Sequence, residues 1–116
     1  MKYTVWTPVI GAALALGACA AGPKPTPKLV DAQAAVRAAD EIGAARVPQA
    51  QLHIQLAHEE LQRADKLMQD GDDERAAGAV ERAKADAELA LALTRRTQAE
   101  RELTRAQPNV GAGTAP

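Results

Sequence analysis

Residues 47–93 read VPQAQLHIQLAHEELQRADKLMQDGDDERAAGAVERAKADAELALAL, and this stretch decides the fold. Its first half spaces apolar side chains alternately three and four residues apart, at Val47, Ala50, Ile54, Ala57, Leu61, Ala64 and Met68. The same heptad spacing returns after Gly71, at Ala76, Val80, Ala83, Ala87 and Ala90. Such spacing predicts two helices that pack as in a coiled coil. The short connection at Gly71 predicts that they run antiparallel, as a helical hairpin.

The ends of these two helices carry recognisable signals. Pro48 suits the first turn of a helix, where its missing N–H costs nothing. Gly71 is suited to end the first hairpin helix, because glycine readily adopts the left-handed conformation. Asp72, followed by Asp73 and Glu74, is placed to cap the second helix and to complement its dipole.

A further helix is predicted before the hairpin. Its apolar positions are spaced three, four and three residues apart, at Leu29, Ala32, Val36 and Ala39. Thr26 is the expected N-cap, Pro27 the expected first helical residue, and Gly43 the expected end. The predicted fold is therefore all-α, a helical hairpin with an additional N-terminal helix in a small three-helix bundle, and residues 29–106 form the helical domain.

The second hairpin helix presents mostly alanine to its partner. Each alanine contact removes little apolar area from water, so the hairpin depends heavily on helix propensity. In a domain this small, burial barely offsets the loss of conformational entropy. We expect the N-terminal helix to supply the missing burial by completing the bundle, with self-association as a possible addition.

The predicted helices differ in length. Residues 73–106 form a longer helix than residues 48–70, so its end must overhang its partner or pack on the first helix. Arg95, Arg96 and Arg101 lie near that end and form the densest basic group after residue 18. One interpretation is a docking surface for an anionic partner, such as peptidoglycan, phospholipid head groups or an acidic protein face. The interpretation we favour is a solvated helix end in which Arg96 pairs with Glu100 at i,i+4.

The N-terminus has the layout of a secretory signal. Lys2 precedes an apolar run over residues 5–16, which is shorter than the roughly 20 residues that a membrane span needs. The run ends at Leu16-Gly17-Ala18-Cys19, and Cys19 is the only cysteine, so no intramolecular disulfide can form. This tetrapeptide resembles the lipobox of bacterial lipoproteins. The resemblance implies a signal peptide over residues 1–18, cleavage between Ala18 and Cys19, and acylation of Cys19.

The resemblance also implies a location. Ala20 follows Cys19, where bacterial lipoproteins retained in the inner membrane favour aspartate, so the expected location is the outer membrane, facing the periplasm. Residues 19–28 include Pro23, Pro25 and Pro27 and predict an extended tether. Residues 107–116 are small and turn-prone, and we interpret them as a disordered tail.

Composition excludes several functions. Beyond the signal there is no aromatic residue and no serine, which removes base-stacking platforms, an aromatic ligand pocket and a serine nucleophile. The formal net charge of −1 argues against nucleic acid as a partner. No small-molecule substrate is evident, no cofactor is expected, and we predict that the protein is not an enzyme.

The two histidines do not predict a metal site. His53 and His58 are five residues apart, which rotates one about 140° from the other around a helix. A zinc-binding helix would place its histidines four residues apart on one face. We therefore expect no metal and place both histidines beside the apolar seam.

Residues 47–93 also resemble an alanine-rich domain of bacterial envelope proteins, the domain of unknown function number 4398. The resemblance rests on Pro48, the Gly71-Asp72 turn and the closing Ala85-Asp86-Ala87-Glu88-Leu89-Ala90. It implies a helical domain and no defined activity. Together with the lipobox, it predicts a lipid-anchored outer-membrane protein with a structural or protein-interaction role. The alternatives are an accessory subunit of a larger envelope assembly, a peptidoglycan-contacting scaffold and, less favoured, an envelope enzyme.

Overall fold

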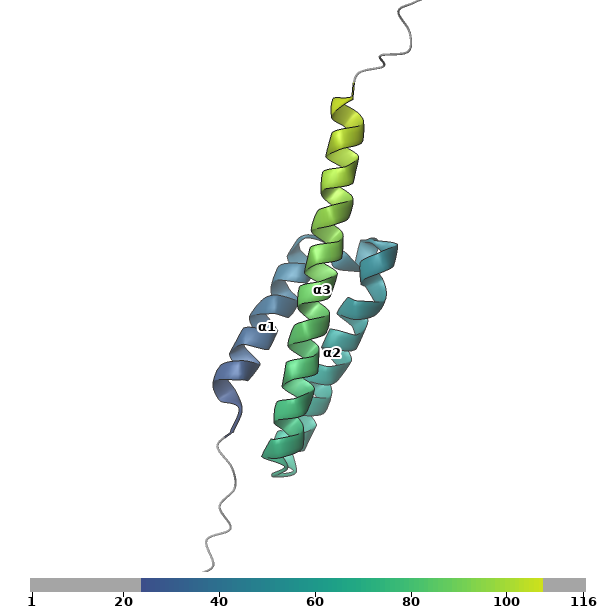
Figure 1. The fold of residues 1–116 in the computed structure, drawn as a ribbon. Helices are drawn as coiled ribbons and strands as arrows, with labels where there is room; N and C mark the ends of the chain where they lie inside the picture. Colours follow the sequence, from purple (N-terminus) through teal and green to yellow (C-terminus); the bar gives the residue numbers. More distant parts are fainter. Residues whose placement is uncertain (1–23, 108–116) are drawn as a thin grey trace, which may run out of the picture.

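The computed structural model describes residues 24–107. Helix α1 (Thr26–Glu41) is followed by the short 3-10 helix η1 (Ala44–Arg46), then by α2 (Pro48–Gln69) and α3 (Asp73–Ala106). The three long helices lie side by side, with α2 and α3 joined as an antiparallel hairpin (Figure 1). The predicted all-α three-helix bundle is confirmed.

The heptad seam of the hairpin is the core of the bundle. Every predicted seam position of α3 is buried, as are Val47, the N-cap of α2, and four seam positions of α2 itself, Ala50, Ile54, Ala57 and Ala64. Leu61 and Met68 are half-buried. Leu61 packs against both groups of core residues, one centred on Ile54 and the other on Val80, so the core is continuous along the bundle.

The turn between α2 and α3 has the predicted geometry. Gly71 adopts φ +80°, the left-handed conformation that other residues avoid. The N–H of Asp72 donates to the carbonyl of Leu67 at 2.8 Å, and that of Gly71 to Met68 at 3.2 Å, which together form a Schellman motif. The side chain of Asp72 then accepts from the N–H of Arg75 and caps α3.

Helix α1 begins earlier than predicted. The N–H of Leu29 donates to the carbonyl of Pro25 at 2.8 Å, so Pro25 occupies the N-cap position and Thr26 is the first helical residue. Thr26 makes no capping hydrogen bond through its side chain, so the prediction that it is the N-cap is wrong. Proline at positions 25 and 27 suits both the cap and the first turn, because neither position needs an N–H donor. Residues 26–28 therefore belong to the helix and not to the tether.

The end of α1 agrees with the sequence. Ile42 is the C-cap and Gly43 follows with φ +82°, so the helix stops where predicted. Val36 and Ala39 of α1 are buried in the same core as Ile54 of α2 and Ala87 of α3. The N-terminal helix thus completes the bundle.

Helix α3 continues beyond the other two helices, as its predicted length required (Figure 1). Its last polar contacts with the bundle come from Thr97, whose hydroxyl donates to Gln49 at 3.3 Å, and from Gln98, whose amide donates to the carbonyl of Ile42 at 3.2 Å. From residue 98 onward every residue of the helix is exposed. We call residues 99–106 the α3 extension.

No helix within residues 24–107 is both long and apolar enough to cross a membrane. The predicted signal peptide, with Ala18 and Cys19, and residues 108–116 of the predicted tail lie outside the described residues.

Candidate functional site

The three arginines of the predicted partner surface surround α3 near its end. Arg95, Arg96 and Arg101 are all exposed. Because consecutive residues of an α-helix are rotated by about 100°, these three side chains leave the helix in directions roughly 100–140° apart. Arg96 donates to Glu100 at 2.8 Å, which is the predicted i,i+4 pair. The three arginines therefore do not share one face.

Arg101 instead belongs to a polar face of α3. The buried seam ends at Thr94, whose hydroxyl donates to the carbonyl of Ala90 at 2.8 Å. The same heptad spacing continues through Thr97, Arg101 and Thr104, so the seam becomes polar where the bundle stops. These three residues line a shallow hollow together with Glu100 and Arg105. The basic end of the helix is thus an open hydrogen-bonding face.

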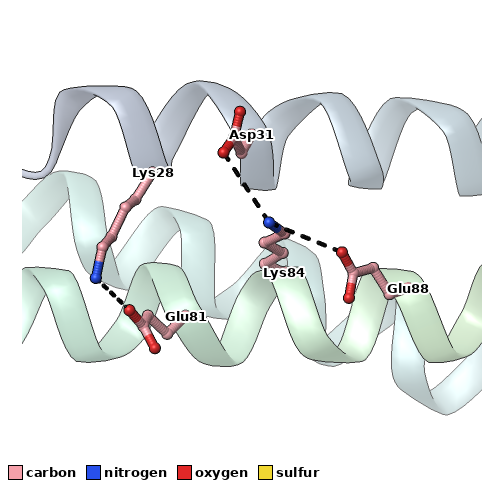
Figure 2. Close-up of polar contacts among 5 residues, drawn as sticks. All are labelled: Lys28, Asp31, Glu81, Lys84 and Glu88. Atoms are coloured by element: carbon pink, nitrogen blue, oxygen red, sulfur yellow. Dashed lines mark hydrogen bonds and ion pairs between the residues drawn. The ribbon is translucent and has the colours of Figure 1, made fainter.

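A second polar site lies between α1 and α3. Lys28 of α1 pairs with Glu81 of α3, and Lys84 of α3 lies 4.0 Å from Asp31 and 3.9 Å from Glu88 (Figure 2). These side chains line an open groove of about 360 Å³ with Val80 and Ala85 as its apolar floor. A hydrogen bond from Lys28, with attraction to its charge, holds the pKa of Glu81 below its usual value. The ion pairs Lys28–Glu81 and Lys84–Asp31 fix the register of α1 along α3, because in each pair the lysine and the carboxylate lie on different helices.

The sequence analysis did not find this groove. The spacing of its residues is visible in the chain, since Lys28 and Asp31 are three apart and Glu81, Lys84 and Glu88 follow at three and four. The spacing does not predict the register of α1 along α3. That register determines which charged side chains of the two helices lie close enough to pair.

Each histidine contacts a carboxylate on a different helix. His53 of α2 lies 2.9 Å from Asp86 of α3, and His58 of α2 lies 3.0 Å from Asp40 of α1. The two rings therefore join α2 to its two neighbours from opposite sides of the seam. Within residues 24–107, no group of three histidine, cysteine or acidic side chains is arranged to hold a metal ion.

Two further carboxylates pair with arginine, one between helices and one at the turn. Glu60 of α2 accepts from Arg82 of α3 at 3.0 Å, and Asp72 binds Arg75 at the turn. The hydrogen bond from Arg75 lowers the pKa of Asp72. Asp73 is buried, and one of its oxygens has no hydrogen-bond partner among the described residues. Asp73 lies in the first turn of α3, where the helix dipole stabilises a negative charge.

Comparison with known proteins identifies the family. A search of curated proteins and a search of solved structures each gave no match. A family model, the domain of unknown function DUF4398, matches residues 27–106, which include all three long helices except the first residue of α1. The match is wider than the resemblance over residues 47–93, because it includes α1 and the α3 extension. This chain belongs to the DUF4398 family.

Proposed function

We propose that this protein is a lipoprotein of the bacterial outer membrane, anchored through Cys19, whose helical bundle has a structural or protein-interaction role in the periplasm. The observation that carries the proposal is the position of the α3 extension, at the end of the bundle opposite the first turn of α1 (Figure 1). A tether that enters α1 would leave that extension free to make contacts.

The distance between the two ends supports this role. Helix α3 has 34 residues, and at about 1.5 Å per residue it is roughly 50 Å long. Only six residues separate Cys19 from Thr26, so an anchor at Cys19 would hold the first turn of α1 close to the membrane. A bundle of this length could therefore reach a partner well away from its anchor.

An interaction role fits the site chemistry better than catalysis. One helix is joined to another by the two interhelical ion pairs of the groove, the two histidine contacts and the Glu60–Arg82 pair. A catalytic acid or base needs a free group in an environment suited to its task, whereas these groups are exposed or half-buried and are paired between helices. We therefore propose that the protein is not an enzyme.

A second candidate is an accessory subunit of a larger envelope assembly or a scaffold that contacts peptidoglycan. The polar face of Thr97, Arg101 and Thr104 favours it, because arginine and hydroxyl donors suit a carboxylate-bearing partner. A photo-crosslinking residue at Arg101, with one at the exposed Arg63 of α2 as its control, tests this candidate. Adducts to one envelope component from Arg101 alone would support it, and equal labelling from both positions would contradict it.

The anchor is tested by Cys19→Ser. We expect this variant to accumulate as an uncleaved precursor or to leave the membrane fraction, whereas Ala21→Ser, two residues further along, should fractionate as the parent chain does. The readouts are membrane fractionation and the intact mass of the purified protein. An unchanged mass and distribution of Cys19→Ser would refute the lipid anchor.

A further inference from the structure

Helix α3 carries a second heptad pattern on the side opposite its buried seam. Its positions alternate four and three residues apart, at Ala85, Leu89, Ala92, Arg96, Ala99, Leu103 and Ala106. Each position lies two residues after a position of the seam or of its polar continuation, so this outer stripe is rotated about 160° from the seam. All seven residues are exposed.

The outer stripe has two large apolar side chains. Leu89, beside the bundle, is 43% exposed and Leu103, on the α3 extension, is 68% exposed. A helix that is apolar on two opposite faces is suited to packing on both sides. One side of α3 packs on α1 and α2. On the other side Ala85 lines the groove beside α1, and the stripe from Leu89 to Ala106 is exposed.

The α3 extension also lacks a partner. It has eight residues and makes no contact through its side chains with α1 or α2 among the hydrogen bonds and ion pairs of the described residues. The end of a helix that projects past its tertiary contacts frays more readily than the packed part, because only helix propensity stabilises it. A partner that covered Leu103 would stabilise this segment.

We propose that the outer stripe pairs antiparallel with the outer stripe of a second copy of this chain, as a two-fold dimer over residues 89–106. In this register Leu103 lies opposite Ala92 of the second copy, and Leu89 lies opposite Ala106 of the second copy. Each leucine thus meets an alanine, which leaves room for the larger side chain. Arg96 lies opposite Ala99 of the second copy, and its long aliphatic stem can cover that alanine while Glu100 keeps its guanidinium paired.

Charge selects this register. Arg95 and Glu102 flank the outer stripe, and neither forms an ion pair within residues 24–107. In the proposed pair Arg95 of each copy lies beside Glu102 of the other, which gives two interchain contacts of opposite charge.

The other ways of pairing the outer stripe with itself are worse. A parallel pair places Arg96 opposite Arg96 of the second copy in its centre. The antiparallel pair shifted by one heptad places Arg95 opposite Arg95 of the second copy, and Glu88 opposite Glu102 of the second copy. Both arrangements bring like charges together, which costs free energy.

The pairing names a partner for the proposed interaction role. Its orientation at the membrane rests on the proposed function, because lipid anchors at both Cys19 residues would lie at opposite ends of the dimer. The dimer would then lie along the membrane surface. The pairing itself depends only on the outer stripe. An experiment can therefore refute the dimer without refuting the lipid anchor, and can refute the lipid anchor without refuting the dimer.

Cysteine crosslinking in cells tests both the pairing and its direction. Disulfides need Cα atoms within about 7 Å, so only facing positions are linked. We expect the double variant Ala92→Cys/Leu103→Cys to form a disulfide-linked dimer upon oxidation, at least about fivefold more than Ala92→Cys/Thr104→Cys, in which the second cysteine is on another side of the helix. Each single variant and the parent chain, with Cys19 alone, should form little dimer.

The outcomes separate the alternatives. A dimer from Leu103→Cys alone would indicate parallel pairing and overturn the proposed register. Equal crosslinking in the Thr104 control would indicate random collision and overturn the interface. No disulfide-linked dimer, or adducts to another protein in its place, would overturn the second copy as the occupant.

A solution measurement checks the same interface without cysteine. The purified mature chain in detergent should have twice the monomer mass by sedimentation, after correction for bound detergent. Leu103→Glu should reduce the mass twofold while Thr104→Glu leaves it unchanged. Both positions are exposed, so circular dichroism of the bundle should persist in each variant. Equal masses for the two variants would refute the interface.

Discussion

Ile54 should be the most sensitive position of the core. It is 2% exposed and packs among Ala50, Ala57, Ala87 and Ala90, which have no side-chain atoms beyond Cβ with which to fill a vacancy. Ile54→Ala removes three carbon atoms, for a transfer cost of about 2.5 kcal/mol at about 0.8 per methylene. The cavity left among these alanines raises the expected loss to about 3–4 kcal/mol.

That loss is large for a bundle of this size. Domains have about 0.05–0.15 kcal/mol of stability per residue, so a domain of about 80 residues has about 4–12 kcal/mol in total. We expect Ile54→Ala to lower Tm by about 12–32 °C, at about 4–8 °C per kcal/mol. Thermal and urea unfolding, followed by far-ultraviolet circular dichroism, measure both quantities at one fixed protein concentration, since pairing would make Tm depend on concentration.

The matched control lies two residues away on the same helix. Leu52 is 59% exposed, and Leu52→Ala should change the free energy of unfolding by no more than about 0.5 kcal/mol. A loss below about 1 kcal/mol for Ile54→Ala, or equal losses for the two variants, would show that the heptad register assigned to α2 is wrong.

Three further predictions concern the turn and the groove. Gly71→Ala should cost about 1–2 kcal/mol in urea unfolding, because φ +80° is strained for alanine even though no atom lies near the added Cβ; an unchanged midpoint would contradict the left-handed turn. Asp72→Ala should destabilise α3 by removing its N-cap, whereas Asp72→Ser should retain most of the stability because serine can also cap a helix. Equal thermal midpoints for the two variants would contradict the capping role of Asp72. The pKa of Glu81 is lowered in the folded state from its ordinary value of 4.5. The stability that Glu81 contributes is therefore present at neutral pH. It is lost as the pH falls below 4.5 and through the lower pKa of the folded state. Acid unfolding should therefore be less steep for Glu81→Gln than for the parent chain, and identical acid titrations would contradict the pairing with Lys28.

The hairpin was predictable because its signals are local. Heptad spacing identifies the faces of α2 and α3, and Gly71 and Asp72 identify the turn through backbone and capping chemistry that a few residues determine. The start of α1 was less predictable, since Pro25 and Thr26 both satisfy the rules for a helix N-terminus and the hydrogen bond from Leu29 decides between them. The groove at Lys28 and Glu81 needed the register between two helices that are far apart in sequence.

Alanine explains why the outer stripe was not found from the sequence. When alanine occurs on every side of a helix, apolar spacing alone does not single out one face, and Ala85, Ala92 and Ala99 fit a second heptad as well as Ala83, Ala87 and Ala90 fit the first. Burial separates the two sets, because the first is buried and the second is exposed. Only then do Leu89 and Leu103 indicate an unpartnered side.

The proposed pair also accounts for the length of α3. In the proposed register the extension, residues 99–106, lies along residues 89–96 of the second copy, on the side of its helix that faces away from its bundle. Among the described residues, Gln98 makes the last hydrogen bond of α3 with its own bundle, to the carbonyl of Ile42. The extension is therefore as long as the exposed segment that it would cover, and the two bundles lie on opposite sides of the paired helices. A shorter α3 would leave Leu89 of the second copy uncovered, whereas the eight exposed residues past Gln98 bring Ala106 to it.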